Sequence, residues 1–74
     1  MLKPGYYRHF KGGLYQLVGI ARHSETLEQM VVYRAPGEEG GLWARPLVMW
    51  EEQVLHEGQL QPRFKWLGEE PPQT

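Results

Sequence analysis

Short runs of β-prone residues, separated by turn-forming residues, recur along the whole chain. The longest run covers residues 14–23, and a second run at residues 29–34 follows it after a short polar stretch. Two β-prone runs joined by a short polar loop are typical of a β-hairpin. We therefore expect a hairpin here and expect the rest of the chain to be organised around it.

Cross-strand pairing energies favour one register for this hairpin. With residues 24–27 as the loop, large apolar residues face each other and a histidine faces a carboxylate. The expected pairs are His23 with Glu28, Ala21 with Met30, Ile20 with Val31 and Val18 with Tyr33.

The strand at residues 14–23 carries apolar residues on both of its faces. A strand with one face in water would alternate instead. In a small barrel one bent strand can serve two sides of the core, and Gly19 lies where a bend or bulge is expected.

The other expected elements are short because glycine and proline interrupt the chain often. Residues 47–54 predict one helical or 3₁₀ turn packed by Leu47, Trp50 and Val54, with an irregular edge as the alternative. Residues 35–41 predict a flexible connector. The remaining expected elements are strands at residues 5–10, 42–45 and 60–67 and turns at residues 11–13 and 56–59.

About five short strands and at most one helical turn indicate an all-β fold. We expect a small SH3-like barrel, with an OB-like barrel as the alternative, in a single domain over residues 1–67. Residues 68–74 are acidic and proline-rich, and this composition predicts a disordered tail.

Composition narrows the class of protein. A chain of 74 residues forms one small domain, and its lack of cysteine excludes disulfides and thiolate metal sites. The net charge of −1 argues against nonspecific coating of DNA. No apolar run approaches the length of a membrane span, so we expect a cytoplasmic protein without membrane contact.

Several motifs occur in an order that resembles one small bacterial family. They are PGYYRHFKGGLY at residues 4–15, GIARHSETLE at 19–28, VVYR at 31–34, LWARP at 42–46 and PRF at 62–64. Over about residues 4–64 the chain is similar to the family known as domain of unknown function 1653. The resemblance implies a compact single domain with no established activity, and it supplies no mechanism.

The polar loop is the first candidate site. His23 with Ser24, Glu25, Thr26 and Glu28 is typical of a hydrogen-bonded turn, and it is also a plausible surface for recognising a polar ligand. A hydrolase or lyase would pair His23 or His9 with Glu25 or Glu28. Neighbouring strand residues point to opposite faces, so His23 is poorly placed to activate Ser24.

Basic residues interleaved with aromatic residues are the second candidate, since single-stranded nucleic acids and nucleotides bind to such surfaces. Packing explains much of this pattern, with Trp43 and Phe64 expected in the core. Arg45 and Arg63 lie beside prolines and aromatic residues, and Glu25 or Glu28 is a plausible partner for them. The histidines lack the spacing of a metal site, so we expect no metal or cofactor.

The leading hypothesis is a non-enzymatic binding module for a polar or anionic ligand, either nucleic acid, nucleotide or peptide. Its expected site residues are Tyr7, His9, Tyr15, His23, Ser24, Glu25, Thr26, Glu28, Arg45 and Arg63. The alternatives are the small hydrolase or lyase and an accessory or oligomer-forming subunit. In the last case Trp50 and Trp66 would form an exposed apolar patch for a homodimer or another protein partner.

Overall fold

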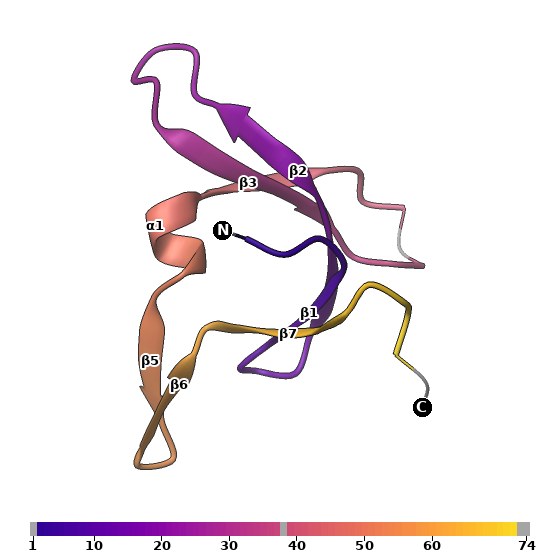
Figure 1. Cartoon of the computed structure of the whole chain (residues 1–74), viewed down its shortest axis with the longest axis vertical. Coiled ribbons are helices and arrows are strands. Elements are labelled where there is room, and N and C mark those ends of the chain that lie inside the picture. Colours follow the sequence, from indigo (N-terminus) through magenta and orange to yellow (C-terminus); the bar gives the residue numbers. More distant parts are fainter. Residues whose placement is uncertain (1, 38, 73–74) are drawn as a thin grey trace.

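A computed structural model describes residues 2–37 and 39–72 of the chain. Most of the structure is antiparallel β-sheet, as the sequence predicts, and Figure 1 shows the arrangement. The main sheet has five strands in the order β4-β3-β2-β1-β7. These strands are β1 (Tyr6–His9), β2 (Leu14–Arg22), β3 (Gln29–Arg34), β4 (Trp43–Pro46) and β7 (Phe64–Gly68).

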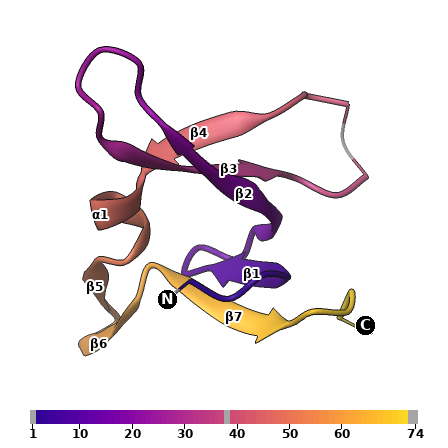
Figure 2. The same cartoon turned by 45° about the horizontal axis from the view of Figure 1, so that its top comes forward.

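The sheet bends but does not close into a barrel. Figure 2 shows β2, β3 and β4 on one side and β1 and β7 on the other, with β2 next to β1 in the sheet. Among the described residues, β4 and β7 are the two edges and do not pair with each other. A closed SH3-like or OB-like barrel is therefore not observed. After β4 the chain instead forms the short helix α1 (Leu47–Trp50) and a separate hairpin.

The central hairpin follows the predicted register over most of its length. Ala21 lies opposite Met30, Ile20 lies opposite Val31, and the His23 N–H donates to the Glu28 carbonyl oxygen at 2.7 Å. The predicted pairing of Val18 with Tyr33 is wrong. A bulge between Leu17 and Gly19, where the sequence predicts a bend, places Leu17 opposite Tyr33 instead.

The second hairpin was not expected from the sequence. It consists of β5 (Gln53–His56) and β6 (Gln59–Pro62), with Glu57 and Gly58 at positive φ in its tight turn. The predicted single strand at residues 60–67 is wrong because the chain breaks at Arg63. The backbone N–H of Arg63 donates to the backbone carbonyl oxygen of Glu52, and the Arg63 carbonyl oxygen accepts from the backbone N–H of Phe10. Arg63 therefore links the two sheets.

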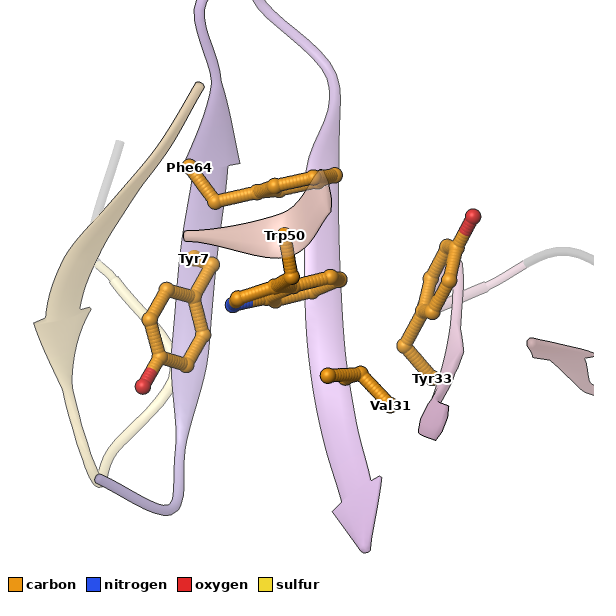
Figure 3. Close-up of a cluster of buried hydrophobic side chains, with 5 residues drawn as sticks. All are labelled: Tyr7, Val31, Tyr33, Trp50 and Phe64. Carbon is orange, nitrogen blue, oxygen red and sulfur yellow. The ribbon is translucent and has the colours of Figure 1, made fainter. Parts of the chain in front are cut away.

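The core is a small aromatic cluster on the concave side of the sheet (Figure 3). The Trp50 ring stacks on Phe64 with centroids 3.7 Å apart and planes 5° apart. Its centroid also lies 5.3 Å from that of Tyr7, with the ring planes at 76°, and 5.1 Å from that of Tyr33. Val31 completes the buried set. One helical turn thus delivers a side chain that contacts β1, β3 and β7.

The prediction that Trp43 lies in the core is wrong, since this residue is 56% exposed. The prediction that Trp50 packs from a helical turn is confirmed, and its 2% exposure contradicts only the alternative of an apolar surface patch at Trp50. The reason is that α1 turns Trp50 inward over the sheet, and nothing of comparable size covers Trp43 on the edge strand β4. Trp66 is 38% exposed, and its indole N–H donates to the Pro4 carbonyl oxygen at 3.0 Å.

The connector and the tail lack regular structure where they are described. Residues 35–37 and 39–42 form no helix or strand, and Glu38 lies outside the described residues. Gly68 ends β7, residues 69–72 are irregular, and residues 73–74 also lie outside the described part. Within the described chain, no helix has the length and apolar character needed to cross a bilayer.

Gly5 generates a prediction because the backbone of β7 approaches it very closely. Its φ is +126°, and an added Cβ would lie 2.2 Å from the Gly68 carbonyl oxygen. We expect Gly5→Ala to lower the free energy of unfolding by about 2 kcal/mol or more, since both the backbone conformation and the contact become strained. Chemical denaturation measures this loss.

The matched control is Gly19→Ala, because an added Cβ there meets no atom within 4 Å. We expect the control to change stability by less than about 1 kcal/mol. Equal losses in the two variants would contradict the proposed close approach.

Candidate functional site

A cavity of about 450 Å³ opens on the concave face of the sheet, beside the connector between β3 and β4. This volume lies within the range of about 300–1,000 Å³ that small-molecule sites occupy. We call it the aromatic pocket. It is lined by Tyr15, Tyr33, Ala35, Glu39, Gly40, Gly41, Trp43 and Arg45.

Strand register builds the wall of the aromatic pocket. Tyr33 on β3 lies directly opposite Trp43 on β4, so both side chains lie on one face of the sheet. Tyr15 on β2 meets Tyr33 at 5.4 Å with the ring planes at 90°. The adjoining connector contributes Gly40 and Gly41, which have no side chains to fill the space. The α1 side chains cover the neighbouring part of this face but not the part at Trp43.

Arg45 lies where the aromatic pocket meets the core. It is opposite Val31, which is fully buried, and its guanidinium carbon lies 5.5 Å from the centre of the Phe64 ring. The Arg45 Nε atom is buried and has no hydrogen-bond partner among the described residues. A buried donor without a partner costs free energy, so this guanidinium group is suited to an acceptor supplied from outside the chain.

His9 adjoins the aromatic pocket behind Tyr15. Its ring lies 4.9 Å from Phe64 and 6.4 Å from Tyr15. The Lys11 backbone N–H donates to His9 Nδ1 at 3.1 Å, which leaves the proton of the neutral ring on Nε2. Burial lowers the pKa of His9, and the positive charges of Arg45, Arg63 and Lys11 lower that pKa further.

The structure brings together only part of the predicted site. Tyr15 and Arg45 line the aromatic pocket, and His9 lies next to it. Arg63 forms an ion pair at 2.9 Å with Glu52, so its predicted partners Glu25 and Glu28 are wrong.

Tyr7 lies in the core rather than in a groove. Its hydroxyl group donates to the Lys3 carbonyl oxygen, and it is 4% exposed. Burial is the main cause that raises the pKa of Tyr7. The hydrogen bond to Lys3 opposes that rise, and the negative charge of Glu51 adds to it.

The predicted loop site lies at the opposite end of β3 from the aromatic pocket. Figure 1 shows this loop at the tip of the β2–β3 hairpin. The backbone N–H groups of Glu25 and Thr26 donate to His23 Nδ1 at 3.1 and 3.3 Å, and Thr26 Oγ1 accepts from the Glu28 N–H at 3.2 Å. Leu27 adopts a positive φ of 65°. These polar groups therefore hold the turn, and Ser24 lies exposed on it.

Histidine and carboxylate groups do not form the pair that a hydrolase or lyase would use. Within the described residues, the close histidine–carboxylate contact is between His56 and Glu57 at 3.7 Å, on the exposed turn of the β5–β6 hairpin. The charged groups that influence His9 are cations. Across the described ranges, no three histidine, aspartate or glutamate side chains gather as metal ligands would.

Sequence reasoning missed Tyr33, Trp43 and Glu39 as pocket residues. The aromatic and basic pattern contained the first two, but Trp43 was assigned to the core. The sequence of β4 could have identified Trp43, because residues two positions apart in a strand share a face and Arg45 was already a candidate. Glu39 lies in the irregular connector, where periodicity carries no information.

A family model and a solved structure both relate this chain to the same family. A family model described as a protein of unknown function, DUF1653, matches residues 5–66. A crystal structure of a DUF1653 protein from Bordetella bronchiseptica is 39% identical in sequence, with a TM-score of 0.86. The match covers 97% of this chain and 95% of the other chain. A search of curated proteins found no match.

The position of His9 predicts a pH dependence of stability. Because folding lowers its pKa, the unfolded chain binds a proton more readily. Neutral His9 should therefore contribute fully to the free energy of unfolding above the ordinary histidine pKa of about 6.5. This stabilisation should be lost as the pH falls toward the lower pKa of the folded state. Unfolding in denaturant at a series of pH values measures it.

The variant for this test is His9→Asn, whose side-chain oxygen can still accept the Lys11 N–H. Comparison with the natural chain at about pH 8, where histidine is neutral, isolates the effect of lost packing. Below that pH we expect the variant to lose less stability than the natural chain. Parallel curves down to about pH 5 would refute the assignment.

Proposed function

Since the chain belongs to the DUF1653 family of proteins of unknown function, we propose a role from the geometry of its site. The protein is a non-enzymatic binding module that holds a planar, polar or anionic ligand in the aromatic pocket. One observation carries this proposal. Arg45 has a buried Nε without a hydrogen-bond partner in the described chain, and it borders a cavity of about 450 Å³ with three aromatic side chains.

The aromatic side chains support a planar ligand. Trp43 is 56% exposed although it faces the same side of the sheet as buried Tyr33, so its ring offers apolar surface to a partner. Stacking on such a ring contributes about 1–3 kcal/mol for each nucleic-acid base. The ring plane of Tyr15 is at right angles to that of Tyr33, and both rings line the pocket.

Arg45 supports a polar or anionic group on that ligand. Its guanidinium group is always charged and presents several N–H donors in one plane, which suits carboxylate and phosphate groups. An acceptor at the buried Nε would satisfy a donor that the described protein leaves unpaired. Glu39 on the connector offers an acceptor for an amino or hydroxyl group of the ligand.

A binding role is favoured over catalysis by the identity of the groups around the pocket. His9 is influenced by three cations, and no carboxylate contributes to its pKa shift. General acid–base catalysis by a histidine–glutamate pair requires hydrogen-bond reach between the two groups. We also propose action in the cytoplasm, which the absence of cysteine supports.

Nuclear magnetic resonance tests the proposal, since each of the three tryptophans gives its own indole N–H signal. The probes are purine and pyrimidine nucleosides, their monophosphates and aromatic carboxylates. We expect at least one probe to shift the signal of Trp43, and we expect the signal of Trp50, which is 2% exposed, to stay unchanged. Absence of a Trp43 shift with every probe would refute the pocket as a binding site.

Arg45→Gln tests the role of the guanidinium group in the same experiment. A charge-assisted hydrogen bond contributes about 1.5–3 kcal/mol, so we expect affinity to fall about tenfold or more. The matched control is Arg22→Gln, which removes the same charge from an exposed residue at the far end of β2. The control should bind within about twofold of the natural chain. Equal losses in the two variants would show that Arg45 has no specific role.

A further inference from the structure

Three cationic side chains lie over the two phenylalanine rings that His9 contacts. Lys11 belongs to the turn that follows β1 and Arg63 precedes β7, and their Nζ and Cζ atoms lie 5.7 and 5.9 Å from the centre of the Phe10 ring. Arg45 approaches from β4, over Phe64. The His9 ring itself contacts both of these aromatic rings, at 4.6 and 4.9 Å. Positive charge from three separate parts of the chain therefore converges on one aromatic cluster.

This convergence is unusual because the protein as a whole is slightly acidic, with a net charge of −1. Arg63 is neutralised in part by its ion pair with Glu52. Lys11 and Arg45 form no ion pair among the described residues. A local excess of positive charge beside a partly enclosed hollow raises the local concentration of anions.

The cation cluster and the aromatic pocket adjoin each other through shared neighbours. Arg45 lines the pocket and lies over Phe64, which His9 also contacts, and Tyr15 lines the pocket with its ring 6.4 Å from that of His9. A ligand with a planar group on Trp43 and an anionic group on Arg45 would thus extend toward His9 and Lys11.

We propose that this ligand is a nucleoside phosphate, with its base in the aromatic pocket and its phosphate group on Arg45, Lys11 and His9. The proposal rests on the proposed function, because it assigns a chemical class to the ligand of the same pocket.

Phosphate fits the cluster better than a carboxylate does. A terminal phosphate group presents three strong acceptor oxygens and close to two negative charges at neutral pH. The cluster offers a guanidinium fork, an ammonium group and the Nε2 proton of His9, which come from three directions. A carboxylate carries one negative charge and has its lone pairs in a single plane, so it matches donors that come from three directions less well.

Phosphate binding at this position is coupled to protonation of His9. The charged groups that act on His9 are Lys11 from the turn, Arg45 from β4 and Arg63 before β7, while Tyr15 of β2 packs against it as a neutral group. A bound anion offsets those positive charges, so the bound complex accepts a proton on His9 more readily than the free protein does. By linkage, a ligand of constant charge binds more tightly as the pH falls.

The first test compares the affinities of adenosine monophosphate and adenosine by titration calorimetry. The indole N–H signal of Trp43 shows whether each ligand binds in the aromatic pocket. We expect the monophosphate to bind about tenfold more tightly or better. Lys11→Gln should weaken binding of the monophosphate about fivefold and leave adenosine unaffected, because its ammonium group meets only the phosphate. Lys65→Gln, which alters an exposed lysine on β7, is the matched control.

The second test uses cyclic adenosine monophosphate, a phosphodiester whose charge stays constant in this range. We expect its affinity to rise as the pH falls from about 8 to about 6 in the natural chain, and to stay level in His9→Asn. A short single-stranded oligoadenylate tests the source of the ligand. Tighter binding of the oligomer with a steep salt dependence indicates nucleic acid, and equal affinity per site indicates a free nucleotide.

The outcomes separate this inference from the proposed function. If adenosine binds as tightly as its monophosphate, or an aromatic carboxylate shifts Trp43 and no nucleotide does, the phosphate assignment is wrong and the pocket remains a binding site. If no probe shifts Trp43, both proposals fail. A level pH profile of the natural chain with the cyclic probe would overturn the role of His9.

Discussion

The stack of Trp50 on Phe64 is the contact on which the remaining structure depends. The rings lie 3.7 Å apart, and Trp50 also contacts Tyr7 and Tyr33, so one side chain joins three strands of a sheet that does not close by hydrogen bonds. Figure 3 shows the indole nitrogen pointing toward the Tyr7 ring. This nitrogen is buried without a hydrogen-bond partner in the described chain, and the aromatic contacts around Trp50 offset the cost of burying it. In so small a domain, few other contacts can replace such a cluster.

The position of Trp50 also determines where the molecule stays open. The one turn of α1 is long enough to cover the sheet at Val31 and too short to cover it at Trp43, two residues farther along the paired strands. The connector that follows β3 has Gly40 and Gly41 at the open part. Arg45 lies at the boundary, with the core on one side and the hollow on the other. The aromatic pocket therefore exists because α1 covers only part of this face of the sheet.

The sequence predicts local features well and the arrangement of faces poorly. The hairpin, its register at Ala21 and Ile20, and the irregularity near Gly19 follow from alternation and turn residues, which act over a few positions. Trp43 was predicted in the core and is exposed, because alternation places it on the same face as buried Tyr33 but does not show that α1 leaves this part of the face uncovered. Periodicity in one strand does not reveal which neighbouring element covers it. The polar loop forms the hydrogen-bonded turn that its sequence predicts.

The positions of the charged side chains indicate that the aromatic pocket is more than an uncovered part of the hydrophobic core. An arginine needed only for solubility would extend its guanidinium group into water, as long basic side chains do. Arg45 instead lies over Phe64 with a buried Nε. Burial lowers the pKa of His9, and the charges of Arg45, Arg63 and Lys11 lower that pKa further. Holding cations together in this way lowers stability unless an anion offsets them. Glu52 supplies that charge to Arg63, whereas Arg45 and Lys11 form no ion pair among the described residues.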